Sequence, residues 1–401
     1  MNVSESNTSE WDADIAIVGC GPVGATLALL LANYGLSSVV LDKENAIYPL
    51  PRAVHFDDQI MRVFQSIGIA EELIKVIRYN PGMRFVDPNG DLLLDWPRPS
   101  GISENGWHSS YRFHQPDLET LLRTRLAEHR RSQLISNAEV TDLQQTDSGC
   151  VTSFKHRKNS QLATVKSRYV VGCDGANSTV RKFIGEGVDD LGFNERWIVI
   201  DVLLSEDKPD LGDFTIQHCG GERPSTYVRG PANRRRWEIS LNDTDDSHQI
   251  TSDDSIWNLL APWLSPSEAT IERRAVYEFK STVAKRWRNK RLFIAGDAAH
   301  LTPPFMGQGM CAGIRDVANL AWKLAVAVKR DEVECPSVTG MLDSYQQERE
   351  PNVKQYITTA IDLGVLLNSC RTKESLDKAF PNVDGVVQMS SIVPGLGEGL
   401  K

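Results

Sequence analysis

The residues best suited to chemistry lie within the segment 291–324 (RLFIAGDAAHLTPPFMGQGMCAGIRDVANLAWKL). An apolar run, Leu292–Ala295, ends at Gly296 and Asp297, and a double proline and a glycine-rich turn then lead into a stretch with helical spacing. This order predicts a strand that delivers the Asp297 carboxylate to a ligand, followed by a loop and a helix. The helix N-terminus would point at the same ligand, where its free N–H groups and dipole favour negative charge.

A glycine motif near the N-terminus predicts a second ligand-binding turn. The β-branched run Asp14–Val18 leads into G-x-G-x-x-G, formed by Gly19, Gly21 and Gly24, with an expected helix after it. A second expected strand ends at Asp42, 18 residues after the last glycine. The glycines allow a tight turn and close approach to a pyrophosphate, and the acid accepts hydrogen bonds from a ribose. The motif predicts a dinucleotide site but does not by itself distinguish NAD from FAD.

A third motif lies in the middle of the chain. An expected strand over 169–173 ends at Asp174 and Gly175, and Ser178 and Arg181 complete the pattern D-G-x-x-S-x-x-R. Asp-Gly alone usually marks a turn. Together, however, the three motifs resemble, in their order and separations, the class A flavoprotein monooxygenases, the single-component aromatic hydroxylases. The resemblance covers roughly residues 12–365.

Shorter segments narrow this resemblance to the 3-(3-hydroxyphenyl)propionate hydroxylase branch, which acts on meta-substituted phenolic acids. They are 51–54 (PRAV), 82–86 (GMRFV), 115–116 (QP), 236–240 (RWEIS) and 303–311 (PPFMGQGMC). The sequence departs from the branch at two places. His55 and Phe56 stand where a smaller or aliphatic pair is expected, and the chain ends at Lys401, whereas many members carry a further thioredoxin-like domain.

The resemblance implies an FAD-dependent monooxygenase that uses NAD(P)H and O2. Such an enzyme hydroxylates a phenolic ring ortho or para to an existing hydroxyl, through a hydroperoxide at flavin C4a. The implied substrate is 3-(3-hydroxyphenyl)propionate or a similar aromatic acid. Two alternatives stay open: a related flavin hydroxylase that tailors a polyketide or antibiotic aromatic, and a non-catalytic FAD-binding protein. The choice between NADH and NADPH is also open.

The resemblance also assigns residues to the cofactor. The cofactor-binding set is Gly19, Gly21, Gly24, Asp42, Arg52, Gln115, Asp174, Gly296, Asp297, Gly309 and Met310. Arg52 is expected at the pyrophosphate, because a guanidinium fork matches phosphate oxygens. Asp297 is expected to accept from the ribityl chain, and the Gly309 and Met310 N–H groups to face flavin O2. Asp174 is expected to anchor its turn against the flavin and the pyridine nucleotide.

Residues that meet the substrate are harder to predict. By resemblance Pro304, which has no N–H to donate, lines the hydroxylation site. The candidates for the base that deprotonates the phenol are His55, Tyr111, His114, His218 and Tyr227, of which His55 and Tyr227 are placed with Pro304 as catalytic candidates. The candidates for substrate contact are His218, Arg229 and Arg236, the two arginines because a substrate carboxylate needs cationic donors.

Composition excludes several classes of function. The 401 residues are 41% hydrophobic and 24% charged, as in a soluble globular protein, and the net charge of −9 gives no reason to expect a nucleic acid or a membrane as partner. The seven cysteines are scattered without C-x-x-C spacing, which predicts neither disulfides nor a metal site and suggests a cytoplasmic protein. The expected partners are therefore a small aromatic substrate, O2 and NAD(P)H, with a homodimer possible.

The predicted fold class is α/β. A Rossmann-like FAD-binding domain, a parallel sheet with helices, is expected to be discontinuous, over 12–80, 110–185 and 284–365. A mainly antiparallel β-sheet substrate domain is expected over 81–109 and 186–283. A helix is expected to begin at Leu342–Arg349 and to be interrupted or restarted by Pro351. Residues 366–401 are expected to be a linker or tail, with a truncated C-terminal extension possible.

Overall fold

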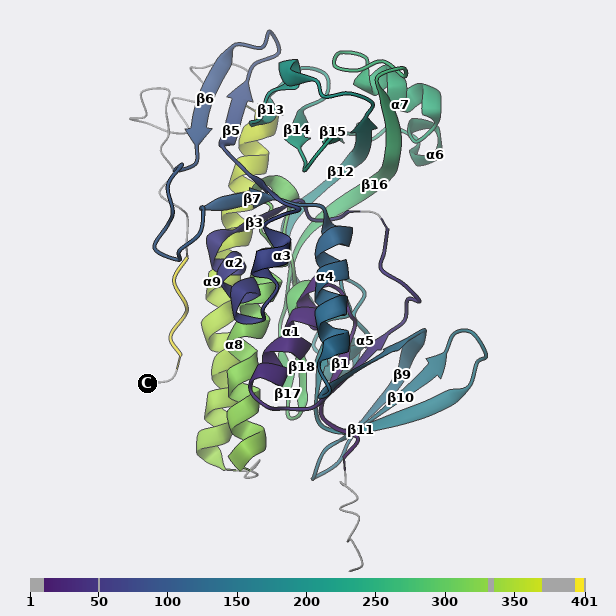
Figure 1. Ribbon diagram of the computed structural model, residues 1–401, viewed down its shortest axis with the longest axis vertical. Coiled ribbons are helices and arrows are strands. Elements are labelled where there is room, and N and C mark those ends of the chain that lie inside the picture. Colours follow the sequence, from purple (N-terminus) through teal and green to yellow (C-terminus); the bar gives the residue numbers. More distant parts are fainter. Residues whose placement is uncertain (1–10, 50, 331–334, 370–393, 400–401) are drawn as a thin grey trace, which may run out of the picture.

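The computed structural model describes residues 11–49, 51–330, 335–369 and 394–399, and contains two large sheets, one above the other in Figure 1. The lower sheet has the strand order β17-β18-β11-β1-β2-β8, with β9 and β10 as a hairpin continuing β11. Its strands are β1 (Ala13–Val18), β2 (Ser38–Asp42), β8 (Ser132–Ser136), β9 (Ala138–Gln145), β10 (Cys150–His156), β11 (Leu162–Gly172), β17 (Arg288–Asn289) and β18 (Leu292–Ile294). Strands β18, β11, β1, β2 and β8 pair in parallel.

This strand order brings the three sequence motifs together. Strands β1, β11 and β18 are neighbours, and each ends directly before one motif. The backbone carries the pairing into the turns, since the Cys173 N–H donates to the Val18 carbonyl at 2.7 Å and the Ala295 N–H to the Gly172 carbonyl at 2.9 Å. Ligands of open parallel sheets bind beyond the carboxyl ends of the strands, so the sheet creates one site from three distant segments.

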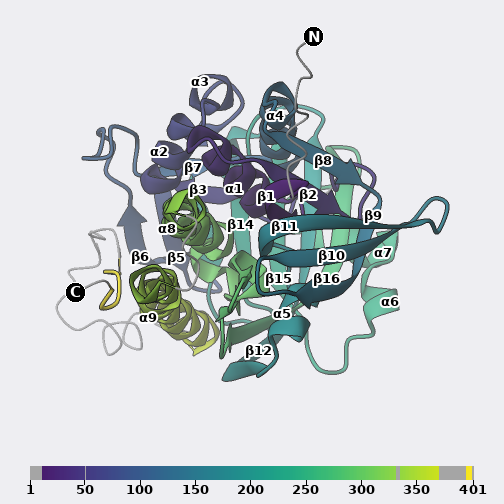
Figure 2. The same cartoon turned by 90° about the horizontal axis from the view of Figure 1, so that it is seen from below.

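Helices cover the lower sheet. They are α1 (Pro22–Asn33), α2 (Asp58–Ser66), α3 (Ala70–Leu73), α4 (Gln115–Glu128), α5 (Thr179–Ile184), α8 (Gly309–Arg330) and α9 (Pro336–Ser369). Figure 2 shows α8 and α9 side by side and nearly end on, with α1 beside α8. The central strand β1 and helix α1 are almost wholly apolar and buried, as expected for a parallel strand covered on both faces.

The upper sheet has the order β19-β16-β12-β15-β14-β13-β5-β6. Its strands are β5 (Gly82–Val86), β6 (Leu92–Pro97), β12 (Val188–Leu204), β13 (Thr215–His218), β14 (Ser225–Arg229), β15 (Arg234–Ser240), β16 (Ala269–Ala284) and β19 (His300–Leu301). Only β13 and β5 pair in parallel. Its outer face packs an apolar cluster against α7 (Asp253–Leu260), next to α6 (Ser247–Ile250). The predicted α/β fold with a mainly antiparallel second sheet is confirmed.

A small third sheet joins the two large ones. It consists of β3 (His55–Asp57), β7 (Ser110–Arg112) and β4 (Arg78–Tyr79), with β7 in the middle. The described strands of the lower sheet fall within 12–80, 110–185 and 284–365, and those of the upper sheet within 81–109 and 186–283, apart from the last residue of β16 and from β19. The division into domains remains a prediction.

Helix α9 differs from the expectation at Pro351. The helix runs without a break from Pro336 to Ser369, past the proposed boundary at 365. A proline in a helix removes one backbone hydrogen bond. Here packing on both sides of α9 holds the helix together, because Arg349 bonds to α8 and the Gly397 N–H donates to the Glu348 carbonyl at 2.9 Å. Residues 370–393 and 400–401 of the predicted tail lie outside the described residues.

A buried carboxylate fastens α8 to the end of β18. Asp316 is 0% exposed, and its Oδ2 accepts from the Gly296 N–H at 3.1 Å and lies 2.6 Å from His300 Nε2. Its Oδ1 accepts from Arg349 Nε at 2.9 Å. Burial would raise the pKa of Asp316, but His300 and Arg349 outweigh it and lower the pKa below 3.8.

We expect Asp316→Asn to lower the free energy of unfolding by about 3 kcal/mol or more, because it leaves the Arg349 guanidinium buried without its counter-ion. Chemical denaturation at neutral pH measures this. Since the folded-state pKa is depressed, the Asp316 contribution is present at neutral pH and is lost as pH falls below the ordinary range. The matched control is Asp343→Asn, a 52% exposed partner of Arg288, for which a loss below about 1 kcal/mol is expected. Equal losses would contradict the assignment.

Candidate functional site

The first glycine motif forms a turn in which two glycines are required by packing and one is left open. Gly19 has a φ of +97°, and a Cβ there would lie 2.5 Å from the Cys173 carbonyl oxygen. A Cβ on Gly24 would lie 2.0 Å from the Gly19 carbonyl oxygen. By contrast, a Cβ on Gly21 would meet no atom within 4 Å. The N-terminus of α1 therefore faces open space, as a pyrophosphate site requires.

Asp42 has a cationic partner that sequence reasoning missed. The Arg123 guanidinium, from α4, donates to Asp42 Oδ2 at 2.9 Å and to the Cys20 carbonyl at 3.1 Å. Asp42 Oδ1 accepts from the Glu44 N–H at 3.0 Å. Nothing in the local pattern around Arg123 distinguishes it from a surface arginine of an amphipathic helix. Its position beside the glycine turn comes only from the packing of α4 against α1.

Gln115 and Arg236 hold the backbone of the loop that carries Arg52. Gln115 Oε1 accepts from the Arg52 and Ala53 N–H groups at 3.0 and 2.8 Å. From the upper sheet, Arg236 donates to the Pro51 and Arg52 carbonyls at 2.6 and 2.8 Å. The Arg52 side chain itself is exposed. The loop is thus fixed from both sheets while its guanidinium stays available to a ligand.

The Gly296 turn exposes one carboxylate in an otherwise buried segment. Asp297 reaches solvent, whereas residues 291–296 and 298–300 are buried. The surrounding protein still desolvates the Asp297 carboxyl and raises its pKa, and His300 and Arg52 only partly offset this. Helix α8 begins nearby at Gly309, where a Cβ would meet no atom within 4 Å. The first N–H groups of α8, including those of Gly309 and Met310, have no partner within the helix.

The two carboxylate oxygens of Asp174 differ in their hydrogen bonding. Its Oδ2 accepts from the Thr179 and Val180 N–H groups at 2.7 and 3.2 Å and so caps α5. Its Oδ1 is buried and has no hydrogen-bond partner among the described residues. Burial raises the pKa of this carboxyl. Arg181 of the same motif donates to the Ala298 carbonyl at 2.8 Å, which ties the Asp174 turn to the Asp297 turn.

These features fit FAD. The open space above Gly21 and beside Gly309, the exposed Asp297 and the unpaired Asp174 oxygen all adjoin the ends of three neighbouring strands. They offer N–H groups for phosphates and carboxylates for hydroxyls. Within the described residues no group of three or more His, Cys, Asp or Glu side chains is placed to hold a metal ion.

An inner cavity lies between the loop after Pro303 and the inner face of the upper sheet. It measures about 50 Å³ and has Pro304 on one wall. The polar side chains on its walls are His55, Asn80, Arg98, Arg112, Thr215, Gln217, Thr226 and Glu238. An outer cavity of about 400 Å³ shares five of its lining residues with the inner one, namely His55, Met83, Arg98, Phe305 and Met306. The two cavities therefore lie next to each other.

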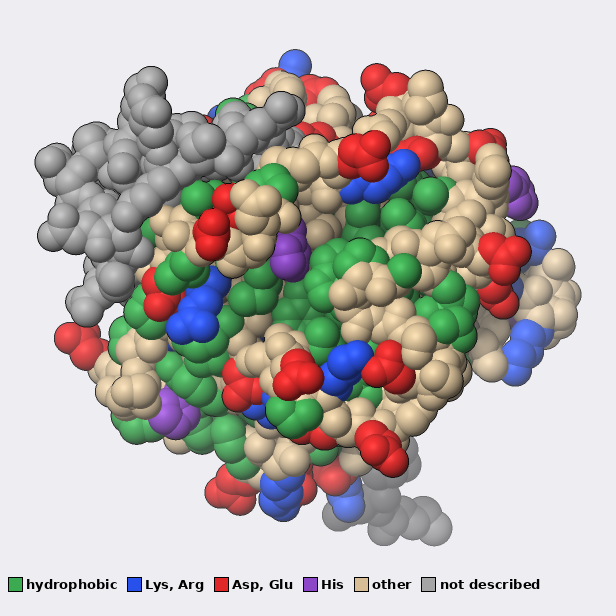
Figure 3. Space-filling model, turned by 90° about the horizontal axis from the view of Figure 1, so that it is seen from above, with side chains coloured by type: hydrophobic (Ala, Val, Ile, Leu, Met, Phe, Trp, Pro, Cys, Tyr) green, Lys and Arg blue, Asp and Glu red, His purple; other side chains and the backbone are tan. Residues whose placement is uncertain are grey.

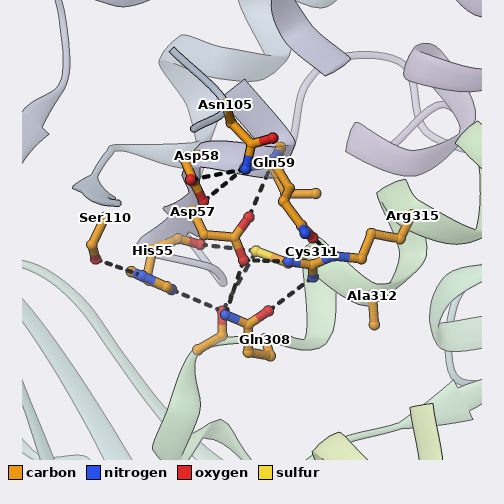
Figure 4. A network of polar contacts seen from close by, with 12 residues as sticks. His55, Asp57, Asp58, Gln59, Asn105, Ser110, Gln308, Cys311, Ala312 and Arg315 are labelled. Atoms are coloured by element: carbon orange, nitrogen blue, oxygen red, sulfur yellow. Dashed lines mark hydrogen bonds and ion pairs between the residues drawn. The ribbon is translucent and has the colours of Figure 1, made fainter. Parts of the chain in front are cut away.

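His55 lines both cavities as a neutral, hydrogen-bonded side chain. Its Nε2 lies 2.8 Å from Ser110 Oγ, and its Nδ1 lies 3.3 Å from the Gly307 carbonyl (Figure 4). A carbonyl only accepts, so the proton is on Nδ1 and Ser110 donates to Nε2. Burial and the nearby Arg112 lower the pKa of His55 to about 3. His55 therefore positions the Gly307 turn, and its role as a base is disfavoured.

A polar network behind His55 fixes the loop that leads into α8. Gln308 donates to Asp57 Oδ2 at 3.2 Å and accepts from Arg315 at 3.0 Å, and Arg315 also pairs with Asp57 (Figure 4). Asp57 Oδ1 accepts from the Ile60 N–H at 3.2 Å and caps α2. The network joins α2 to α8, and it therefore holds the N-terminus of α8 in place.

The catalytic candidate Tyr227 and the substrate candidates His218 and Arg229 lie on the opposite face of the upper sheet from the inner cavity. Tyr227 packs 5.2 Å from the Trp237 ring and donates to the Gly212 carbonyl at 3.3 Å, and His218 lies 5.4 Å from the Trp263 ring. Arg229 pairs with Asp207 at 3.1 Å and with Asp213. Successive strand side chains point to opposite faces, so their neighbours on β13 and β14 reach the cavity instead.

Arg236 and two further histidine or tyrosine candidates are also engaged elsewhere. Arg236 faces inward but is buried against Asp201, with Nε 2.6 Å from Oδ1, and against the Arg52 loop. Tyr111 is buried beside Phe56 and its hydroxyl accepts from the His108 N–H at 2.9 Å. His114 Nδ1 lies 3.0 Å from Asp117 at the start of α4. None of these three side chains lines the inner cavity.

A family model described as FAD binding domain matches residues 12–360, and the chain belongs to this family. It is 38% identical over 353 residues to a probable NADH-specific resorcinol 4-hydroxylase of Rhodococcus jostii (strain RHA1), covering 88% of this chain and 65% of that relative. It is 37% identical over 355 residues to a 3-(3-hydroxy-phenyl)propionate/3-hydroxycinnamic acid hydroxylase of Burkholderia cenocepacia (strain HI2424), covering 88% of this chain and 63% of that relative. The chain thus spans a little under two thirds of each, and the resemblance to this branch is confirmed.

Solved structures share the fold. The p-nitrophenol 4-monooxygenase from Pseudomonas putida DLL-E4 superposes with a TM-score of 0.81 at 21% identity, covering 91% of this chain and 92% of that one. A complex of aklavinone-11 hydroxylase with FAD and aklavinone gives 0.76 at 22% identity, covering 90% and 70%. Among the described residues, no helix has the length and apolar character needed to cross a membrane.

We expect Gly21→Val to weaken FAD binding without harming the fold. Gly21 has φ −74° and ψ −174°, which any residue adopts, and its missing Cβ faces open space. The new side chain would therefore occupy the ligand's volume rather than the protein's. The dissociation constant of FAD should rise at least about tenfold, a loss of about 1.4 kcal/mol, while the melting temperature of the apoprotein stays unchanged. Gly340→Val, at another open position in α9, is the matched control; tight FAD binding by Gly21→Val would refute the placement.

We also expect Asp297→Ala to lose FAD, because the Asp297 carboxylate is the predicted acceptor for the ribityl chain. Stoichiometric FAD after purification of this variant would overturn the role. Since the pKa of Asp297 is raised above 3.8, the acceptor is protonated at a higher pH than a free aspartate. FAD release on acidification should therefore begin at a higher pH in the wild type than an ordinary carboxyl predicts, as followed by flavin fluorescence.

Proposed function

We propose that the chain is an FAD-dependent monooxygenase that uses NADH and O2 to hydroxylate a phenol ortho or para to its hydroxyl. The observation that carries this proposal is the inner cavity, which has the Pro304 loop on one wall and polar side chains of the upper sheet on the other. This cavity adjoins the turns that fit FAD. A small polar-lined cavity next to a flavin site suits a phenolic ring whose hydroxyl is bound while a neighbouring carbon reacts.

The chain's own residues would supply binding, orientation and dryness. The open turns at Gly21 and Gly309 would hold the phosphates and the flavin O2, and Asp297 the ribityl chain. Bound FAD, reduced by NADH, would supply the electrons and the site that activate O2 for transfer. Phe305 and Met306, which line both cavities, would exclude water from the reacting atoms. Pro304 offers no N–H that would compete for the transferred oxygen.

The relatives' names support the substrate class. Resorcinol and 3-(3-hydroxyphenyl)propionate, named for the two relatives, both carry a ring hydroxyl and a second substituent in the meta position. We therefore propose meta-substituted phenols as substrates, with 3-(3-hydroxyphenyl)propionate and resorcinol as first choices. The relative described as NADH-specific supports NADH over NADPH. Arg98 lines both cavities and places a positive charge where they meet.

One observation favours a second candidate. The outer cavity, at about 400 Å³, is larger than a single ring needs. A larger aromatic, such as a polyketide intermediate, would fill both cavities at once. On the face seen from above, Figure 3 shows side chains of both charge signs interspersed around an apolar centre. The two candidates differ in substrate size and share the same chemistry.

Turnover with defined phenols tests the proposal. NADH oxidation by the FAD-loaded protein in air should rise at least about tenfold with resorcinol or 3-(3-hydroxyphenyl)propionate, and mass spectrometry should detect a product with one added oxygen. The control 3-phenylpropionate lacks the ring hydroxyl and should give no such product. If NADH oxidation rises but H2O2 is the only product, the small phenol is not the true substrate, and the proposed substrate becomes a larger aromatic. No stimulation by small phenols or by polycyclic phenols, with FAD bound, would leave a non-catalytic FAD-binding protein and defeat the proposal.

A further inference from the structure

Glu238 is the one carboxylate among the described residues on the wall of the inner cavity. It lies on β15, directly opposite Thr226 of β14 and Val199 of β12. It has the same parity as Arg236 and therefore faces inward, away from the Trp237 cluster. Its side chain is 13% exposed, and Pro304 lines the opposite wall of the same cavity. The Glu238 carboxylate therefore faces the predicted reaction site, on the side of the upper sheet opposite its apolar cluster.

Charged groups surround Glu238 from four strands. Arg236 Nη1 of its own strand lies 3.6 Å from Glu238 Oε1. Asp201 of β12, Arg273 of β16 and Arg112 of β7 act on it from the neighbouring elements. Burial dominates and raises the pKa of Glu238; Arg236 pulls the pKa down and Asp201 pushes it up. A carboxylate with a raised pKa is a better proton acceptor than a free glutamate.

Arg112 supplies a cation on the same wall. It is buried on β7, and its guanidinium donates to Thr215 Oγ1 across the cavity. Burial lowers the pKa of Arg112 to about 9, so it remains protonated at neutral pH. Glu238 and Arg112 also interact electrostatically. The cavity therefore presents a base and a fixed positive charge together.

The remaining polar groups of the cavity are already engaged. Thr226 Oγ1 donates to Gln217 Oε1 at 2.5 Å, and Gln217 Nε2 lies 3.6 Å from Met83 Sδ. Asn80 donates to Ser110 at 2.7 Å, and Ser110 in turn serves His55. These groups orient one another, and none of them is a stronger base than a carboxylate of raised pKa.

We propose that Glu238 accepts the proton of the substrate's phenolic hydroxyl and that Arg112 stabilises the phenolate that results. The O–H bond breaks, its electron pair stays on the phenolic oxygen, and the proton goes to a Glu238 carboxylate oxygen to give the neutral acid. The electron-rich ring carbon ortho or para to that oxygen is then the nucleophile for the oxygen transfer. The inference rests on the proposed function, since it assumes a phenol in this cavity.

Proton uptake on binding tests the assignment without turnover. The oxidised, FAD-loaded protein is titrated calorimetrically with 4-nitrophenol, at a pH at which the free phenol is ionised, in two buffers that differ in ionisation enthalpy. Wild type should take up close to one proton per phenolate bound, because a bound phenolate makes Glu238 bind a proton. Glu238→Gln should take up almost none. Equal uptake by wild type and Glu238→Gln, or no uptake by wild type, overturns the proposal.

A matched control separates this effect from general changes in the sheet. Glu278→Gln makes the same substitution on β16 of the same sheet, at a side chain 58% exposed, and should behave as wild type. If Glu238→Gln fails to load FAD, Glu238→Asp keeps the carboxylate but withdraws it by one methylene and should show a reduced proton uptake. Absence of proton uptake by the wild type would overturn the proposal by itself.

Turnover supplies a second readout. General-base catalysis contributes about 10²- to 10⁴-fold, so kcat for resorcinol should fall at least about a hundredfold in Glu238→Gln. The loss should shrink for phenols of lower pKa, which are already ionised in solution. A Glu238→Gln rate within twofold of wild type overturns the role of Glu238 while leaving the hydroxylase intact. If wild type itself gives no hydroxylated product from any phenol, the proposed function fails first, so the two failures are distinguishable.

Discussion

The contact of the buried Asp316 carboxylate with three separate segments is the interaction on which the site depends. Asp316 accepts from the Gly296 N–H at the end of β18, contacts His300 in the following loop and pairs with Arg349 of α9. It thereby fixes the start of α8 relative to the strand that carries Asp297. A displaced α8 would move its free N–H groups away from that carboxylate. A single desolvated charge therefore sets the geometry of a ligand site that Asp316 itself does not touch.

Elements that depend on local pattern could be predicted from the sequence. The three motifs, the parallel sheet and the helix over 309–330 follow from short-range signals: an apolar run, a glycine turn, an amphipathic repeat. Their convergence follows from topology, because parallel strands place their carboxyl ends at one edge. The residues predicted to bind FAD are in large part glycines and backbone groups, whose positions are set by the turn rather than by distant contacts. That is why the cofactor end of the site was accessible from the sequence.

The substrate end depended on parity and on contacts distant in sequence. His218, Tyr227 and Arg229 carry suitable chemistry, but each lies one residue away from a position that faces the cavity. The helix α7 was not predicted. It covers the outer face of the upper sheet, where Tyr227 and Trp237 pack in an apolar cluster. When α7 is not known, the alternating pattern of the strands predicts that their polar side chains face solvent. Glu238 and Arg112 are 126 residues apart in sequence and line one cavity only because the three-stranded sheet contacts the upper sheet through Arg112 and Thr215.

The loop that carries Arg52 is joined to both halves of the molecule. Gln115 holds it from the FAD-binding side. Arg236 and Arg273, both paired with Asp201, hold it from the upper sheet. This joint limits how the protein can be recombined. An upper sheet taken from a relative with a different substrate would need a matching arginine–aspartate cluster. Without that cluster, the loop that carries Arg52 would lose its hydrogen bonds to the upper sheet. Substrate range and cofactor retention are thus inherited together.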